Sequence, residues 1–314
     1  MSELTPKSII EPVSDDIIEP VPVRTGRRMT RGQLILRRFL RNRTAMVGVL
    51  VYLIIVGFAV IGPHLYYWDY TDVDRLSFLK APSSNHWFGT TQSGNDVFAL
   101  TMRGLQKSIM IGLLVALIST AVAATVGSFA AYFGGWFERG ALWVIDLLLV
   151  IPSFLIIAII TRGGPQGPQA WLLLVVLLAA FAWILDARVV RSLCLTVKER
   201  EYVLAAKFAG LPAPRVIIRH IIPNISSLLI INATLGVGSA ILAETGLSFF
   251  GFGVQPPDTS LGTLIGQGQR MATTFPWIFA FPAVILVVMV MSINAIGDGL
   301  RDALDPNSTS GGRA

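Results

Sequence analysis

Few residues of this chain are of a type and spacing that could support catalysis. The single cysteine, Cys194, excludes a disulfide framework and a cysteine-based zinc site. The three histidines (His64, His86 and His220) lie far apart, and neither H-E-x-x-H nor the phosphate-binding pattern G-x-x-x-x-G-K-[ST] occurs. We therefore expect neither a metalloenzyme nor a self-contained ATPase, and no metal or cofactor held by this chain.

One acidic residue, Asp146, lies inside an apolar stretch. A charge in such a place needs an ionic partner or a wet cavity. We favour an ion pair with Arg188 or Arg191. The alternatives are a proton relay and simple exposure at a membrane surface.

A second polar group lies in residues 232–253, where glycines are mixed with hydroxyl and amide side chains. Such residues serve close helix packing at least as often as they line a transport path, and we favour packing. The residues that would line a path are Asn232, Thr234, Ser239, Glu244 and Ser248.

The segment 186–224 is too charged to cross a membrane, yet it carries helix signals. Thr196 and Glu199 form a T-x-x-E capping box, and Gly210 followed by Pro212 is a stop signal. The pattern predicts a surface helix from Thr196 to Gly210, with a second short amphipathic helix over 214–223. The first helix would either rest on lipid or dock a partner through a face of small residues and Tyr202.

The composition requires that these residues be positioned by membrane helices. Apolar residues make up 53% of the 314-residue chain and charged residues only 14%, against about 25% charged in soluble domains. Runs that are apolar on all sides favour helices over a β-barrel. We predict an all-α polytopic protein with six spans, near 44–66, 108–133, 141–160, 170–185, 225–243 and 275–296, with a kink at Pro152.

Basic residues give the expected orientation. Nineteen of the 25 Lys and Arg fall on one side of the six predicted spans, so both termini should be cytoplasmic. This asymmetry also explains the net charge of +6, and we expect contact with anionic lipids rather than nucleic acid. We divide the chain into a flexible tail with a basic interfacial segment (1–43, with a short helix near 34–40), a membrane domain (44–306) and a C-terminal tail (307–314).

Four stretches resemble one family. EYVLAAKFAG at 201–210, followed by HIIPN at 220–224, is similar to the EAA loop of binding-protein-dependent ABC importer permeases. The stretches 87–97 (WFGTTQSGNDV), 243–257 (AETGLSFFGFGVQPP) and 297–306 (GDGLRDALDP) are similar to the C-type permease subunit of oligopeptide and dipeptide importers. The resemblance covers about residues 35–306.

The resemblance implies a type I ABC importer permease fold in a bacterial inner membrane. The chain would form half of a peptide path, and a second permease subunit would complete the heterodimer. Two ATPase subunits or domains would bind ATP and Mg²⁺, and an extracytoplasmic binding protein would deliver the peptide. In such a path Glu244 could bind an amino group, but we favour a structural role because a tolerant path should lack a tight cationic site.

The resemblance also makes the surface helix a coupling helix to an ATPase. The family's EAA glutamate falls on Leu204, and Glu201 lies one turn earlier. The expected contact residues are Glu201, Tyr202, Leu204, Ala205, Ala206, Phe208, Ala209 and Gly210.

Two alternatives remain at this stage. An ion-coupled transporter would need paired ionisable residues in repeated helices, but only Asp146 and Glu244 qualify and no repeat is evident. A permease for a metal chelate such as nickel would belong to the same family, although no His, Cys and Met cluster supports it.

Overall fold

The computed structural model describes residues 30–164, 167 and 169–305, and its regular elements in that part of the chain are helices. The tail before residue 30 and the tail predicted for 307–314 lie outside the described residues. The elements are α1 (Arg31–Arg41), α2 (Arg43–Leu65), α3 (Val97–Phe133), α4 (Gly135–Val150), α5 (Ser153–Gly163), α6 (Ala170–Lys198), α7 (Glu201–Phe208), α8 (Ala213–Val216), η1 (Ile217–Ile221, one π-helical turn), α9 (Ile222–Phe249), α10 (Leu261–Gln269) and α11 (Pro276–Leu304). The prediction of an all-α membrane protein is confirmed.

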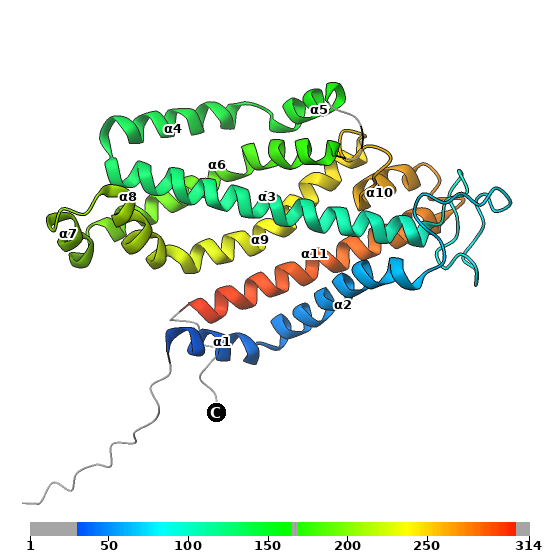
Figure 1. The fold of residues 1–314 in the computed structure, drawn as a ribbon, viewed down its shortest axis with the longest axis horizontal. Helices are drawn as coiled ribbons and strands as arrows, with labels where there is room; N and C mark the ends of the chain where they lie inside the picture. The colour runs from blue at the N-terminus through cyan, green and yellow to red at the C-terminus, as the bar shows by residue number, and fades with distance from the viewer. Residues whose placement is uncertain (1–29, 165–166, 168, 306–314) are drawn as a thin grey trace, which may run out of the picture.

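Five helical segments within the described residues are long and apolar enough to cross a membrane, or six if α4 and α5 count as one bent span. They form an elongated bundle in which α3 packs between α6 and α9, while α11 lies between α9 and α2 (Figure 1). The apolar runs that were predicted to span the membrane therefore form helices that pack together in one bundle.

The third predicted span is a broken helix. Helices α4 and α5 meet at an angle of 75° on either side of Ile151 and Pro152. Proline has no backbone N–H to continue the helical ladder, and its ring clashes with the preceding turn. The predicted kink at Pro152 is confirmed, and the bend is sharp enough to set α5 apart from the line of α4.

Several predicted boundaries were wrong. Helix α3 begins at Val97, where the Asp96 carboxylate caps it by accepting a hydrogen bond from the Ala99 N–H at 2.8 Å. Helix α6 continues through Thr196 to Lys198, so the predicted capping box does not start a helix. The Lys198 ammonium donates to the Ala131 carbonyl near the end of α3 at 2.9 Å, which holds the last turn of α6 in place.

Small residues allow the central helices to approach closely. A Cβ added at Gly127 of α3 would lie 2.6 Å from the Ala187 carbonyl oxygen of α6. A Cβ at Gly112, on the same helix, would lie 2.5 Å from the Ile241 side chain of α9. Helix α3 therefore packs closely against α6 and α9 through its small residues.

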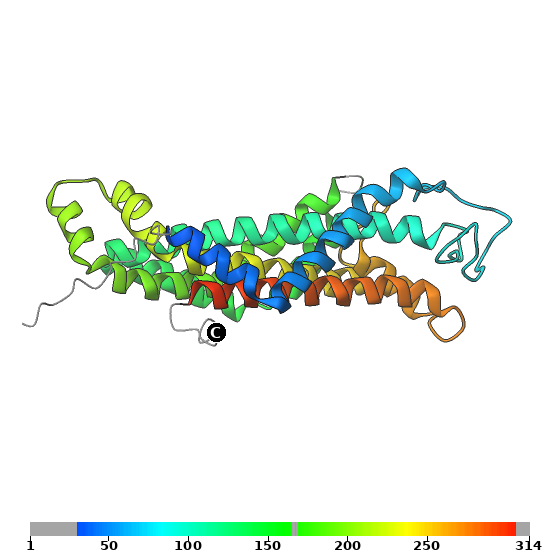
Figure 2. The ribbon, with the colours of Figure 1, turned by 90° about the horizontal axis from the view of Figure 1, so that it is seen from below.

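The bundle has two different ends (Figure 2). Helices α7 and α8 project from one end, where α1 begins and α11 finishes; we call it the basic end because most Lys and Arg of the loops lie there. The loop 66–96 and the loop after α10 lie at the opposite end. The short helix predicted near 34–40 is present as α1.

Candidate functional sites

The first candidate site is α7 with the turn that follows it. Val203 and Ala206 point inward, into a cluster that contains Val190 and Cys194 of α6 and Ile217 of η1. The other residues from Glu201 to Gly210 are exposed. The helix is therefore anchored by two side chains and presents the rest of its surface outward.

The outward surface of α7 differs from the predicted face at one residue. Ala206 is buried, so its side chain does not belong to the docking surface. Phe208, one of the expected contact residues, is 86% exposed at the end of the helix. Tyr202 accepts a hydrogen bond from the Asn224 side chain, which ties α7 to the start of α9.

The predicted stop at Gly210 is confirmed. Gly210 adopts a φ of +79°, a left-handed conformation that glycine adopts without strain. The Leu211 N–H then donates to the Ala206 carbonyl at 3.3 Å, closing the helix end in the manner of a Schellman motif. The predicted start at Thr196 was wrong, so the surface helix is shorter than expected.

The second candidate site is a partly open cavity of about 430 Å³ lined by α3, α5, α6 and α9. Its lining is mostly apolar, with polar side chains from each of the four helices: Ser119, Ser153, Asp186, Asn232 and Ser239. The size lies within the range of small-molecule sites. Of the five residues proposed for a path, Asn232 and Ser239 line this cavity.

The other three path candidates lie elsewhere. Thr234 donates its hydroxyl to the Ile230 carbonyl of its own helix. Glu244 is fully buried and accepts hydrogen bonds from Ser108 of α3 and from Ser248, while Ser248 in turn accepts from the Ser260 hydroxyl and the Val254 N–H. Glu244 and Ser248 therefore join α9 to α3 and to the start of α10.

Ion pairs link α4 to α6. Asp146 pairs with Arg188, one of the two partners that the sequence suggested. Arg191 pairs instead with Glu138, at the beginning of α4. Sequence reasoning missed Glu138 because the third predicted span begins only at residue 141, whereas α4 begins at Gly135.

Sequence reasoning also missed Asp186. This residue follows the apolar run 170–185 and was read as the first residue of the loop, but α6 continues past it. Asp186 lines the cavity, and its carboxylate accepts a hydrogen bond from the Asn232 amide at 3.4 Å.

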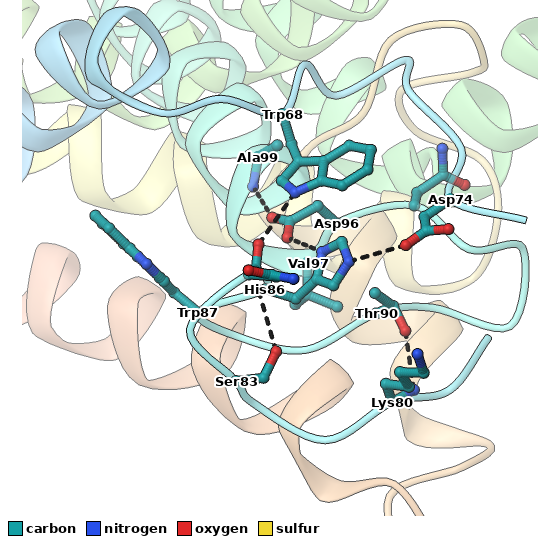
Figure 3. A network of polar contacts seen from close by, with 12 residues as sticks. Trp68, Asp74, Lys80, Ser83, His86, Trp87, Thr90, Asp96, Val97 and Ala99 are labelled. Atoms are coloured by element: carbon teal, nitrogen blue, oxygen red, sulfur yellow. Dashed lines mark hydrogen bonds and ion pairs between the residues drawn. The ribbon is translucent and has the colours of Figure 1, made fainter. Parts of the chain in front are cut away.

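The loop 66–96 folds around a buried histidine (Figure 3). The His86 imidazole lies between the carboxylates of Asp96, at 2.8 Å from Nδ1, and Asp74, at 3.3 Å from Nε2, and it stacks on Trp68. Hydrogen bonds from Ser77 and from the Leu76 N–H lower the pKa of Asp74. The loop is thus a structured unit held by buried polar contacts.

Asp96 is the centre of this unit. Besides capping α3 and contacting His86, its carboxylate accepts a hydrogen bond from the Tyr66 hydroxyl at 2.9 Å. Burial and the neighbouring carboxylate raise the pKa of Tyr66, so this hydroxyl keeps its proton. One side chain therefore joins the end of α2, the loop and the start of α3.

Replacing Asp96 with alanine should destabilise the folded chain by about 3 kcal/mol, because the cap of α3 is lost and the buried His86 imidazole and the half-buried Tyr66 hydroxyl each lose a hydrogen-bond partner. The thermal unfolding midpoint of the purified protein should fall by several degrees. The Asp96→Asn variant keeps an acceptor oxygen at the same place, so its unfolding midpoint should lie between those of Asp96→Ala and the unmodified chain. An Asp96→Ala midpoint equal to that of the unmodified chain would contradict this account.

Metal ligands do not gather within the described residues: no group of three or more His, Cys, Asp and Glu side chains there could hold a metal ion.

Comparison with known sequences adds two family matches. Residues 123–309 match the inner membrane component of binding-protein-dependent transport systems. Residues 30–82 match the N-terminal TM domain of oligopeptide transport permease C. The first match begins within α3 and includes α7 together with the cavity-lining helices α5, α6 and α9.

Individual relatives cover nearly the whole chain. The oligopeptide transport system permease protein OppC of Mycobacterium tuberculosis (strain H37Rv) is 50% identical over 90% of this chain and 96% of the relative. OppC of Bacillus subtilis is 33% identical over 96% of this chain and 97% of the relative. A putative peptide permease of Brucella suis is 38% identical over 92% and 94% of the two chains.

Proposed function

Because the chain belongs to the family of inner membrane components of binding-protein-dependent transport systems, we propose that it is a membrane-spanning subunit of an ATP-driven peptide importer. It is a multi-pass protein of the bacterial inner membrane. The observation that carries the peptide assignment is the 50% identity, over almost the full length of both chains, to a permease named for oligopeptide transport.

The proposed role of this chain in the importer follows from the elements that it contains. It holds a bundle of membrane helices with a cavity among α3, α5, α6 and α9, which would form half of the path. A second permease subunit would supply the other half. ATP and Mg²⁺ would be bound by two ATPase subunits or domains, and an extracytoplasmic binding protein would deliver the peptide.

Helix α7 is the proposed contact with one ATPase. It projects from the basic end of the bundle, and the excess of Lys and Arg there supports a cytoplasmic location for this end and for both chain termini (Figure 2). Its inner side is packed against α6 and η1, so a displacement of α7 would reach the helices that line the cavity. Such a contact shifts the equilibrium between inward-open and outward-open states by the difference in its binding free energy for the two states.

The loop 66–96 lies at the other end, where a binding protein would dock. Its fixed shape suits a docking platform, since the partner then does not have to order a flexible segment on binding. The exposed side chains of α2, including Val47, Leu50 and Leu53, would contact lipid or the second permease subunit.

The direct test is uptake by the assembled importer in proteoliposomes. With the cognate binding protein outside and ATP inside, a labelled oligopeptide should accumulate, and removing ATP or the binding protein should abolish accumulation. Uptake that persists without ATP would contradict the proposal and favour an ion-coupled carrier. Uptake of a nickel chelate but of no peptide would keep the ATP-driven mechanism and overturn the substrate class.

A further inference from the structure

We infer that Asp186 and Asn232 form a subsite for the ammonium group at the amino terminus of a peptide in transit. This inference rests on the proposed function and names the chemical group that the path recognises. It starts from the position of Asp186, which lines the cavity from α6 and contacts Asn232 of α9.

Asp186 differs from the other acids of α4 and α6. Glu138 is paired with Arg191, and Asp146 is paired with Arg188. Asp186, the third acid on these two helices, forms no ion pair with any residue that the structure describes. Its polar contact within the described residues is with the neutral amide of Asn232, at 3.4 Å.

The surroundings make an unpaired carboxylate costly. The described lining of the cavity carries a single charged residue, Asp186, amid side chains such as Val115, Ile157 and Leu178. A carboxylate at membrane depth is expensive unless it faces water or a cation. A cation that enters this cavity is attracted more strongly than it would be in bulk water, because the apolar lining lowers the local dielectric constant.

The geometry fits a primary ammonium group. An ammonium group offers three N–H donors and no acceptor. The Asp186 carboxylate and the carbonyl oxygen of the Asn232 amide supply acceptors from two helices. Ser239, two turns along α9 on the same side, also lines the cavity; its hydroxyl hydrogen points to the Leu235 carbonyl, so its oxygen lone pairs remain available.

A subsite for the amino-terminal ammonium group would recognise a peptide and still accept any peptide sequence. Unblocked peptides carry this group whatever their side chains are, so a subsite for it does not restrict sequence. One carboxylate with one amide binds such a group less firmly than a cage of several acids would, which allows release toward the cytoplasm. The competing occupant is a Lys or Arg side chain from the second permease subunit.

A zero-length cross-link tests the contact directly. A water-soluble carbodiimide is added to the assembled importer during turnover with trialanine, and Asp186 is examined by peptide mass spectrometry. We expect an amide between the Asp186 side chain and the trialanine amine, and none with N-acetyl-trialanine. A link from Asp186 to a lysine of the second permease subunit, or no trialanine adduct at Asp186, would overturn the subsite.

Transport kinetics provide the second readout. Asp186→Asn should lower the maximal uptake rate of trialanine about tenfold, because a charge-assisted hydrogen bond becomes a neutral one, whereas Asp186→Glu should retain most of it. Asp298→Asn removes an exposed carboxylate on α11 and is the matched control; it should transport normally. Equal rates for Asp186→Asn and the unmodified importer would contradict the inference.

The two proposals fail in different ways. If the unmodified importer shows no ATP-dependent peptide uptake, the proposed function is wrong. If it takes up trialanine normally but Asp186 gives neither the adduct nor the loss of rate, only the subsite is wrong.

Discussion

Replacing Phe208 with alanine is expected to reduce the peptide-stimulated ATP hydrolysis of the assembled importer about thirtyfold. The Phe208 ring is 86% exposed at the end of α7, and nothing in the described part of its own chain accounts for so large an apolar surface in that place. A large aromatic side chain at the centre of an interface costs about 2 kcal/mol or more when truncated, which corresponds to roughly thirtyfold in affinity. The measurement is ATPase activity with and without peptide-loaded binding protein.

The effect should be one of coupling rather than of folding, because Phe208 makes little contact within the chain. The variant should therefore reach the membrane and keep its thermal stability. Trp136, an 89% exposed aromatic residue at the start of α4 and at the same end of the bundle, provides the control; Trp136→Ala should leave coupling intact. Full stimulation of the Phe208→Ala importer would remove Phe208 from the proposed ATPase contact.

The fold class could be predicted from the sequence because it depends on local quantities. A run of about 20 apolar residues has to form a helix wherever it lies in a bilayer, since every backbone polar group must be satisfied within the segment. Pro152 breaks α4 from α5 through its own ring, without help from distant residues. Gly210 ends α7 for an equally local reason, its positive φ.

The start of the surface helix could not be predicted, because a tertiary contact overrides the local signal there. Thr196 and Glu199 have the spacing of a capping box, but the Lys198 ammonium bonds to the Ala131 carbonyl and keeps α6 helical past Thr196. Such a contact joins positions 67 residues apart. The capping pattern contains no information about it.

Helical geometry alone shows that the five path candidates lie on different sides of α9. At about 100° per residue, Ser239 lies within about 20° of Asn232 around α9, whereas Glu244 and Ser248 lie about 120° and about 160° away. The five candidates therefore could not all have lined one cavity. The contact between Asp186 and Asn232 could not be predicted from the sequence, because the two residues lie on different helices, α6 and α9.

Replacing Glu244 with alanine should be among the most destabilising single changes in the membrane domain. Its carboxyl group is fully buried and accepts from Ser108 of α3 and from Ser248 of α9. The Ser108 hydroxyl also accepts from the Leu261 N–H at the first residue of α10, at 3.3 Å. Alanine would leave these hydroxyl groups without their acceptor, at about 1–3 kcal/mol for each unsatisfied group, and would leave a cavity as well.

Glu244→Gln separates this structural role from a role in the path. Glutamine keeps the shape and one acceptor oxygen, and the serine hydroxyls can rotate to meet its amide, so the loss of thermal stability should be much smaller than with alanine. If Glu244 only joins the helices, the glutamine importer should transport trialanine within about twofold of the unmodified rate, because a weakened buried hydrogen bond then lowers the stability of the fold without touching the peptide. A glutamine variant with unchanged stability and a transport rate reduced about tenfold would place Glu244 in the path, although its side chain does not line the cavity.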